Sequence, residues 1–333
     1  MTGGRGRAAW ILILLPPALF LVALLVGRFG IRIDEAARAM FGLDGVSDVV
    51  RALVVRVRLP RALAAACIGV NLAMTGAAFQ GLFRNPLVDS RILGISSGAA
   101  FGAAVALLAS VGTFGVQASA FAFALVAMGI VCLIGLRFGS TPLVLVIGGV
   151  LVSALFNALL GLTKYVADPL SSLPAITYWL LGGLSNARWS TIVPLLVVTG
   201  LGLAFFVAIR WRLNILTLSD AEAASLGIRV GRLRTTVIVV GTVLIASSVA
   251  VGGMIGWIGL VVPHVARAWV GPDHARLIPA SAALGAATLL ALDTVARTAM
   301  PSEIPLGILT GLIGVPAFFL LFLRLVRARG AAR

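Results

Sequence analysis

The residues best suited to bind a charged partner are arginines near the first third of the chain and one arginine far along it. They are Arg51, Arg56, Arg58, Arg61 and Arg297. Asp293 lies four residues before Arg297, so the two side chains can pair on one helix face and hold the guanidinium in place. Because a guanidinium binds a carboxylate through two parallel hydrogen bonds, these arginines could dock an acidic soluble partner. Anchoring to lipid phosphates is the alternative interpretation.

A second polar segment, residues 210–234, reads RWRLNILTLSDAEAASLGIRVGRLR. Ser219 and Glu222 have the spacing of a capping box, and Gly227 is expected to end the helix that follows. A short helix, capped at both ends and flanked by arginines, is therefore predicted between two apolar runs. It is typical of a contact element for a cytoplasmic protein, although a plain structural cap remains open.

The sequence argues against several kinds of chemistry. It has no G-x-x-x-x-G-K-[ST] motif and its single lysine is Lys164, so no phosphate-binding loop is present. No convergent catalytic groups are found, and we expect a transport protein rather than an enzyme. His264 and His274 lack metal-site spacing, so we expect structural roles for them, no metal and no cofactor bound by this chain. No carboxylate relay of the kind that drives a secondary transporter is visible, and the energy must come from elsewhere.

Composition places these segments in a membrane protein. Of the 333 residues, 60% are hydrophobic and 11% are charged, and the mean hydropathy is +1.12. Soluble domains carry about a quarter charged residues. The net charge of +15 comes from arginines in short loops, where they set the orientation of the spans, and nothing indicates nucleic-acid binding. Cys67 and Cys132 lie in apolar runs and are expected to be buried, inert thiols.

The apolar runs predict an all-α polytopic protein in one transmembrane domain, residues 1–333, with about ten spanning helices. The first run, 8–27, is expected to be an uncleaved helix, and the block 235–270 is expected to split at Gly252 and Gly253. Residues 173–183 are too short to span and predict a re-entrant or interfacial helix. An even number of spans places both termini on one side, and the arginine bias makes that side cytoplasmic. The remaining expected spans are 62–82, 92–110, 114–136, 143–163, 191–209, 277–296 and 304–323.

The run that follows Arg61 has the features of a helix packed inside the bundle. Asn71 and Gln80 are costly in lipid and are expected to face protein or a water-filled path. Small residues along the run would let neighbouring helices approach closely. These residues are Gly69, Ala73, Gly76, Ala77 and Gly81.

Several blocks of sequence together resemble the FecCD-type permeases of ABC importers, the branch that takes up iron chelates, haem and cobalamin. They are RLPRALAAACIGVNLAMTGAAFQGLFRNPL, LGISSGAA, TLSDAEAASLGI, GMIGWIGLVVPHVARAWVGPDHARLIPASAALGA and EIPLGILTGLIGVPAFF. The resemblance covers nearly the whole chain. The family pattern has an acidic-Pro-Gly sequence after NPL, where this chain has Val88-Asp89-Ser90-Arg91.

The resemblance implies the type II ABC importer permease fold and a homodimer around one central pathway. It implies two cytoplasmic ABC ATPases, which use ATP and Mg, and one periplasmic substrate-binding protein, in a bacterial inner membrane. Arg58, Arg61 and Arg297 match the docking arginines, with Arg56 beside them in the periplasmic loop 28–61. Asn85 and Leu87 match the inner gate, with Ser140 and Thr141 near a second constriction. The coupling helix that contacts the ATPase matches Leu218, Ser219, Asp220, Ala221, Glu222, Ala223, Ala224, Ser225, Leu226 and Gly227.

Substrate identity is weakly encoded, because such pathways hold their substrates weakly. The similarity of GLFRNPL and LGISSGAA to haem-importer permeases favours haem. Ferric siderophore is the second interpretation and cobalamin the third. A secondary transporter working without an ATPase is an alternative of a different class.

Overall fold

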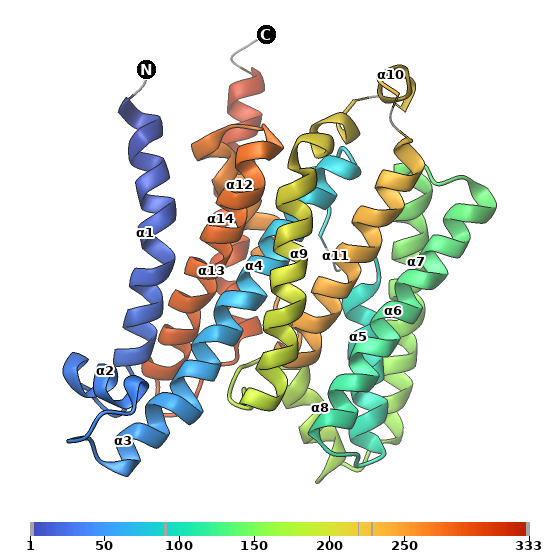
Figure 1. The fold of residues 1–333 in the computed structure, drawn as a ribbon. Coiled ribbons are helices and arrows are strands. Elements are labelled where there is room, and N and C mark those ends of the chain that lie inside the picture. The colour runs from blue at the N-terminus through green and yellow to red at the C-terminus, as the bar shows by residue number, and fades with distance from the viewer. Residues whose placement is uncertain (1–2, 90–91, 219, 228, 331–333) are drawn as a thin grey trace.

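The computed structural model describes residues 3–89, 92–218, 220–227 and 229–330. These residues form a bundle of helices with no strand among them (Figure 1). The helices within residues 3–89 are α1 (Gly3–Leu25), α2 (Ile33–Phe41), α3 (Asp48–Ala52), the π-helical segment η1 (Leu53–Arg58) and α4 (Leu59–Leu82). The next are α5 (Ile95–Leu108), α6 (Thr113–Phe138), α7 (Pro142–Val166), α8 (Ser172–Leu181) and α9 (Trp189–Leu216). The last are α10 (Asp220–Ser225), α11 (Val230–Gly252), α12 (Ile258–Val270), α13 (His274–Thr298) and α14 (Leu306–Gly330).

Six stretches are long and apolar enough to cross a membrane: 48–82, α6, α7, α9, α11 and α13. The expected count of about ten spans is not confirmed. Helices α5 and α12 have only 14 and 13 residues. At 1.5 Å per residue they reach roughly 20 Å, short of a hydrocarbon core of about 30 Å. The apolar parts of α1 and α14, residues 10–25 and 306–320, are also below spanning length among the described residues.

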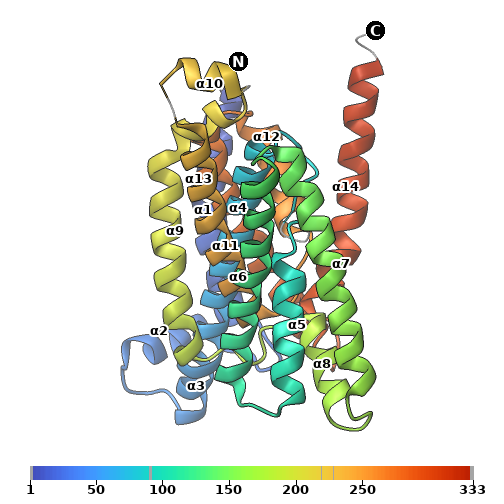
Figure 2. The ribbon, with the colours of Figure 1, turned by 90° about the vertical axis from the view of Figure 1, so that its right-hand side faces the viewer.

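Helix α4 lies at the centre of the bundle. In the most apolar 18-residue window of the stretch 48–82, which contains α4, 83% of the residues are buried, compared with 33% for α6 and 28% for α7 and α9. Helices α1, α9, α11, α12 and α13 pack around it, while α14 and α9 lie at opposite edges (Figure 2). The interpretation of 62–82 as a helix packed inside the bundle is confirmed.

Glycines set the closeness of this packing. A Cβ placed on Gly69 would lie 2.1 Å from the carbonyl oxygen of Gly285 on α13, and one on Gly76 would lie 2.0 Å from that of Gly259 on α12. The backbones therefore touch directly at both crossings, as the small residues along α4 predicted.

The polar residues of α4 face protein. Asn71 is fully buried and donates to Thr199 Oγ1 on α9 and Ser248 Oγ on α11, at 3.0 and 3.1 Å. Gln80 donates to the Leu260 carbonyl and accepts from Arg267, at 3.3 and 3.2 Å. Both side chains tie α4 to its neighbours, so the protein-facing alternative holds for both.

Two loop boundaries differ from the prediction. The segment 28–61 was expected to be a loop, but much of it is helical, and η1 joins α3 and α4 into one stretch, 48–82. The segment 210–234 contains the end of α9 and the start of α11, so the connection is shorter than predicted. The predicted break at Gly252 and Gly253 is confirmed, since α11 ends at Gly252 and Gly253 has a left-handed φ of 68°.

Candidate functional site

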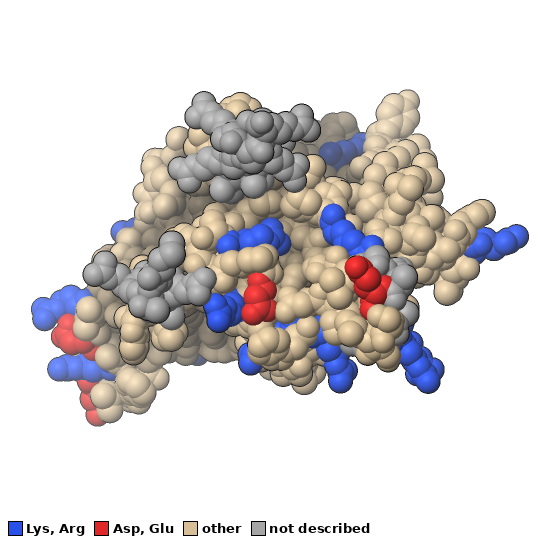
Figure 3. All heavy atoms as spheres, turned by 90° about the horizontal axis from the view of Figure 1, so that it is seen from above, with Lys and Arg blue, Asp and Glu red and all other residues tan. Residues whose placement is uncertain are grey.

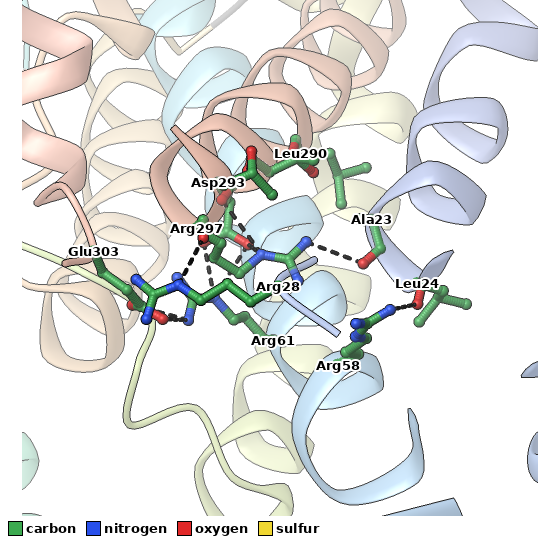
Figure 4. Close-up of polar contacts among 11 residues, drawn as sticks. Ala23, Leu24, Arg28, Arg58, Arg61, Leu290, Asp293, Arg297 and Glu303 are labelled. Carbon is green, nitrogen blue, oxygen red and sulfur yellow. Dashed lines mark hydrogen bonds and ion pairs between the residues drawn. The ribbon is translucent and has the colours of Figure 1, made fainter. Parts of the chain in front are cut away.

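The arginine cluster, defined as Arg58, Arg61, Asp293, Arg297 and Glu303, lies at the end of the bundle that also carries α2 and α3 (Figures 1 and 4). Arg58 and Arg61 come from the junction of η1 and α4, and Asp293 and Arg297 from the last turns of α13. Glu303 belongs to the connection between α13 and α14. Segments far apart in the sequence therefore meet here because α4 packs along α13.

Arg61 is held by two carboxylates. Its Nε donates to Asp293 at 2.9 and 3.2 Å, and its Nη1 donates to Glu303 at 2.8 and 3.0 Å. Asp293 also pairs with Arg297 Nε at 3.2 Å. A buried carboxylate is tolerated when opposite charges and hydrogen bonds replace its lost water. Asp293, 1% exposed, meets this condition through two guanidinium groups.

Arg58 has a different set of partners. Its Nη1 donates to the carbonyls of Leu24 and Leu25, both at 2.7 Å, and its Nη2 donates to the carbonyl of Phe29. Arg297 Nη2 donates to Ala23 at 3.0 Å. Because α1 ends at Leu25, these carbonyls belong to its last turn and the residues after it, where the intrahelical partners run out and cations are favoured. The two arginines therefore cap α1 and fasten it to α4 and α13.

Burial of the cluster differs from the sequence expectation. Arg58, Arg61 and Arg297 are only 3%, 6% and 8% exposed, whereas Arg56 is exposed. Asp293 is buried because α1 and α4 cover this part of α13. The predicted pairing of Asp293 with Arg297 is confirmed. The docking role of all four arginines stays a prediction.

Sequence reasoning missed two members of this region. Neither Glu303 nor Arg28 was assigned to docking. Arg28, exposed, donates to the carbonyls of Arg297 and Met300 at 3.3 and 3.4 Å. The one sequence feature that could have pointed to Glu303 is that it is a carboxylate only ten residues after Asp293. The turn after α13 brings it to Arg61, and this turn is visible only in the structure.

The predicted contact helix lies at the opposite end of the bundle, the end at which α1 begins and α14 ends (Figure 1). It is α10, Asp220–Ser225, between α9 and α11. Gly227 follows with a left-handed φ of 74°, as expected for a residue that ends a helix. Ser219, the predicted cap, lies outside the described residues. Ala223 is buried, whereas Glu222 and Leu226 are exposed.

Arginine side chains are distributed over this end of the molecule (Figure 3).

The predicted gate residues Asn85 and Leu87 lie in the turn after α4, where Asn85 Oδ1 accepts from the Leu87 amide at 2.9 Å. Leu87 is 48% exposed. Thr141 caps α7 by accepting from Val144, and the Ser140 carbonyl accepts from Arg234 at 2.7 Å. These contacts shape two turns, and the gate assignments stay predictions.

A polar junction links α9 to α13 at the same end. Asn214 donates to Asp273 at 2.7 Å and accepts from the backbone amide of His274 at 2.8 Å. Hydrogen bonding to Asn214 and to the amide of Ala275 holds the pKa of Asp273 below its ordinary value. His264 contacts its own helix at the Leu260 carbonyl. Among the described residues no group of three or more His, Cys, Asp or Glu side chains could hold a metal ion.

The functional assignment follows from comparison with known proteins. Residues 12–324 match the profile of the FecCD transport family. The molybdate import permease MolB of Haemophilus influenzae is 36% identical over 310 residues, covering 92% of each chain. The cobalamin import permease BtuC of Halobacterium salinarum is 42% identical, covering 84% of this chain and 75% of that one. The hemin transport permease HmuU of Yersinia pestis is 39% identical, covering 80% and 82%.

Solved structures agree with the sequence comparison. A metal-chelate type ABC transporter in an inward-facing conformation superposes with a TM-score of 0.88 and 35% identity, covering 96% of this chain and 99% of that chain. The family profile, the curated relatives and this fold all extend over most of the chain. The chain therefore belongs to the FecCD transport family.

Proposed function

We propose that the chain is the permease subunit of an ATP-binding-cassette importer that carries an iron chelate across a bacterial inner membrane. The observation that carries this proposal is the family match over residues 12–324, together with a short helix presented between two long ones at one end of the bundle. The permease would supply the pathway, and a separate ATPase would supply the energy.

The proposed partners follow from the two ends of the bundle. The end with α10 would face the cytoplasm and contact an ABC ATPase through α10 as the coupling helix, so that two permease chains would hold two ATPases. The end with the arginine cluster would face the periplasm and receive a substrate-binding protein. Two copies of this chain would enclose the pathway, and the turns at Asn85 and Ser140 would constrict it on the cytoplasmic side.

Haem is the substrate we propose first, as the sequence similarity favoured. Relatives named for hemin, cobalamin and molybdate lie at 39%, 42% and 36% identity. Because these values are similar, sequence identity does not indicate which of these substrates the chain carries. Ferric siderophore and cobalamin remain the next candidates, and the comparison adds molybdate.

Transport in a reconstituted system tests the proposal. The permease is placed in liposomes with its ATPase inside and its substrate-binding protein outside, and uptake of haemin, a ferric hydroxamate, cobalamin and molybdate is measured with and without ATP. ATP-dependent uptake of haemin above the other three is expected. Uptake of a different one would replace haem as the substrate. Uptake that is independent of the ATPase would overturn the importer assignment.

A variant of the contact helix tests the coupling role. Ala224→Trp is expected to leave the permease folded but to abolish stimulation of ATP hydrolysis by the substrate-binding protein, because a bulky side chain blocks seating against the ATPase. Val197→Trp, at an exposed position within α9, serves as the matched control. Normal ATPase attachment and uptake in Ala224→Trp would show that α10 is not the coupling element.

A further inference from the structure

We propose that Glu303 is an internal latch on the arginine cluster, displaced when a carboxylate of the docking partner takes its place on Arg61. This inference rests on the proposed function, which supplies the substrate-binding protein. It assigns a role to the first residue of the block EIPLGILTGLIGVPAFF, which the docking prediction did not include.

The two carboxylates on Arg61 differ in how firmly they are held. Asp293 is 1% exposed, lies on α13 and is shared with Arg297. The Glu303 side chain is 34% exposed, lies on the connection after α13, and has Arg61 as its ion-pair partner. Asp293 is therefore a permanent partner of Arg61, whereas Glu303 can be exchanged.

Charge favours such an exchange. The cluster holds three guanidinium groups, those of Arg58, Arg61 and Arg297, against two carboxylates. A second carboxylate on Arg61 is needed while its side chain is 8% exposed, because the buried Nη1 would otherwise lose a charged partner. An incoming carboxylate that replaces Glu303 keeps this arrangement. Glu303, already partly in water, loses little when it is released.

Release of Glu303 would affect the interior of the bundle through the residues that follow it in the chain. The next residue, Ile304, donates to the Ala296 carbonyl at 3.1 Å, and Leu306 donates to the Gly182 carbonyl, after α8, at 2.9 Å. Gly307 is packed against the backbone of Leu181, where a Cβ would lie 2.5 Å from the carbonyl oxygen. The latch is thus three to four residues from a close backbone contact with the end of α8.

That contact borders a cavity of about 280 Å³. It is lined by the last turn of α8, the first turn of α14 and the segment between α11 and α12, including Leu181, Met254, Trp257 and Gly307. A docking event that frees Glu303 would therefore loosen the connection that forms one wall of this cavity. Through Glu303, binding of the partner would therefore change the packing around this cavity inside the bundle.

Three variants separate a latch from a general charge effect. Glu303→Gln removes the charge of the latch, and Glu303→Asp keeps the charge but shortens the side chain by one methylene. Asp34→Asn is the control, because it removes one carboxylate from an exposed arginine pair at the same end of the bundle. Affinity of the intact permease in nanodiscs for its cognate substrate-binding protein is measured for each.

Exposed ion pairs are worth up to about 1 kcal/mol, which corresponds to roughly fivefold in affinity. We expect Glu303→Gln and Glu303→Asp both to bind the partner roughly two- to fivefold more tightly than the parent protein, and Asp34→Asn to change affinity less. Weaker binding by Glu303→Gln would overturn the latch and make Glu303 part of the docking surface. If Glu303→Asp bound the partner as the parent protein does, and Glu303→Gln bound it as Asp34→Asn does, only the loss of a negative charge would matter. That result would also overturn the latch.

Failure of the proposed function has a different signature. A parent protein that binds no substrate-binding protein and shows no stimulated ATP hydrolysis would refute the importer assignment itself. A parent protein that binds normally, with variants that behave as the control does, would refute only the latch.

Discussion

The crossing of α4 and α13 at Gly69 and Gly285 gives the sharpest test of how this bundle is held together. A Cβ on Gly285 would lie 2.2 Å from the carbonyl oxygen of Gly69. Real Cβ atoms essentially never approach another heavy atom within 3.0 Å, so Gly285→Ala must separate the two backbones by roughly 0.8 Å. The neighbouring contact partners are backbone atoms and Ala73 Cβ, which cannot rotate away.

The magnitude follows from two opposing effects. Overpacking of a close contact costs about 1–3 kcal/mol, whereas replacing glycine by alanine inside a helix gains about 0.5–1 kcal/mol. Because none of the contacting atoms can rotate away, we expect the upper part of the overpacking range, and Gly285→Ala should lower the free energy of unfolding by about 1–2 kcal/mol. Gly200→Ala is the matched control, because it lies within α9 and has open space around its Cβ position.

Thermal unfolding of the detergent-solubilised protein is the assay. We expect Gly285→Ala to unfold several degrees below the parent protein, and Gly200→Ala to unfold at the same temperature or slightly higher. The arginine cluster should also be affected, since the ion pair of Arg61 with Asp293 joins the same two helices. If Gly285→Ala is as stable as Gly200→Ala, direct backbone contact is not what limits the approach of α4 and α13.

Three further predictions concern other parts of the structure. Arg58→Leu leaves the last carbonyls of α1 without their donors and should cost about 3 kcal/mol, seen as increased proteolysis near residue 27, whereas an unchanged digestion pattern would contradict the capping role. Gly227→Ala places a side chain at a φ of 74° and should weaken the end of α10 by about 1 kcal/mol, seen as faster amide exchange there; unchanged exchange would argue against it. Because the pKa of Asp273 is lowered in the folded protein, its stabilising effect is present at neutral pH and is lost as pH falls from about 4 through the lowered value. The stability difference between the parent protein and Asp273→Asn should therefore disappear on acidification, and a difference that persists would refute this linkage.

The sequence was sufficient to predict the helices because their signals are local. Apolar runs, the glycine break at 252–253 and the capping glycine at 227 each act within a few residues. Helix length was predicted less well. Helices α5 and α12 are shorter than spanning length because turns interrupt their apolar runs, and hydropathy does not report where a turn begins.

The pairing of Asp293 with Arg297 was also predictable, because residues four apart on a helix are neighbours. The positions of Arg58 and Glu303 were not. Arg58 is 33 or 34 residues from the α1 carbonyls that it caps, and Glu303 is 242 residues from Arg61. Their meeting depends on α1 and α4 both packing against α13, contacts that no local pattern encodes.

The sequence by itself therefore determined the class of protein, the family and the residues that carry charge. Only the tertiary structure decided which of these charges reach the surface. An arginine near a helix end can bind water, a partner or the carbonyls of another helix. Arg58 and Arg297 bind the carbonyls of another helix, because the packing of α1 against α13 and α4 brings the end of α1 within hydrogen-bonding distance of both guanidinium groups.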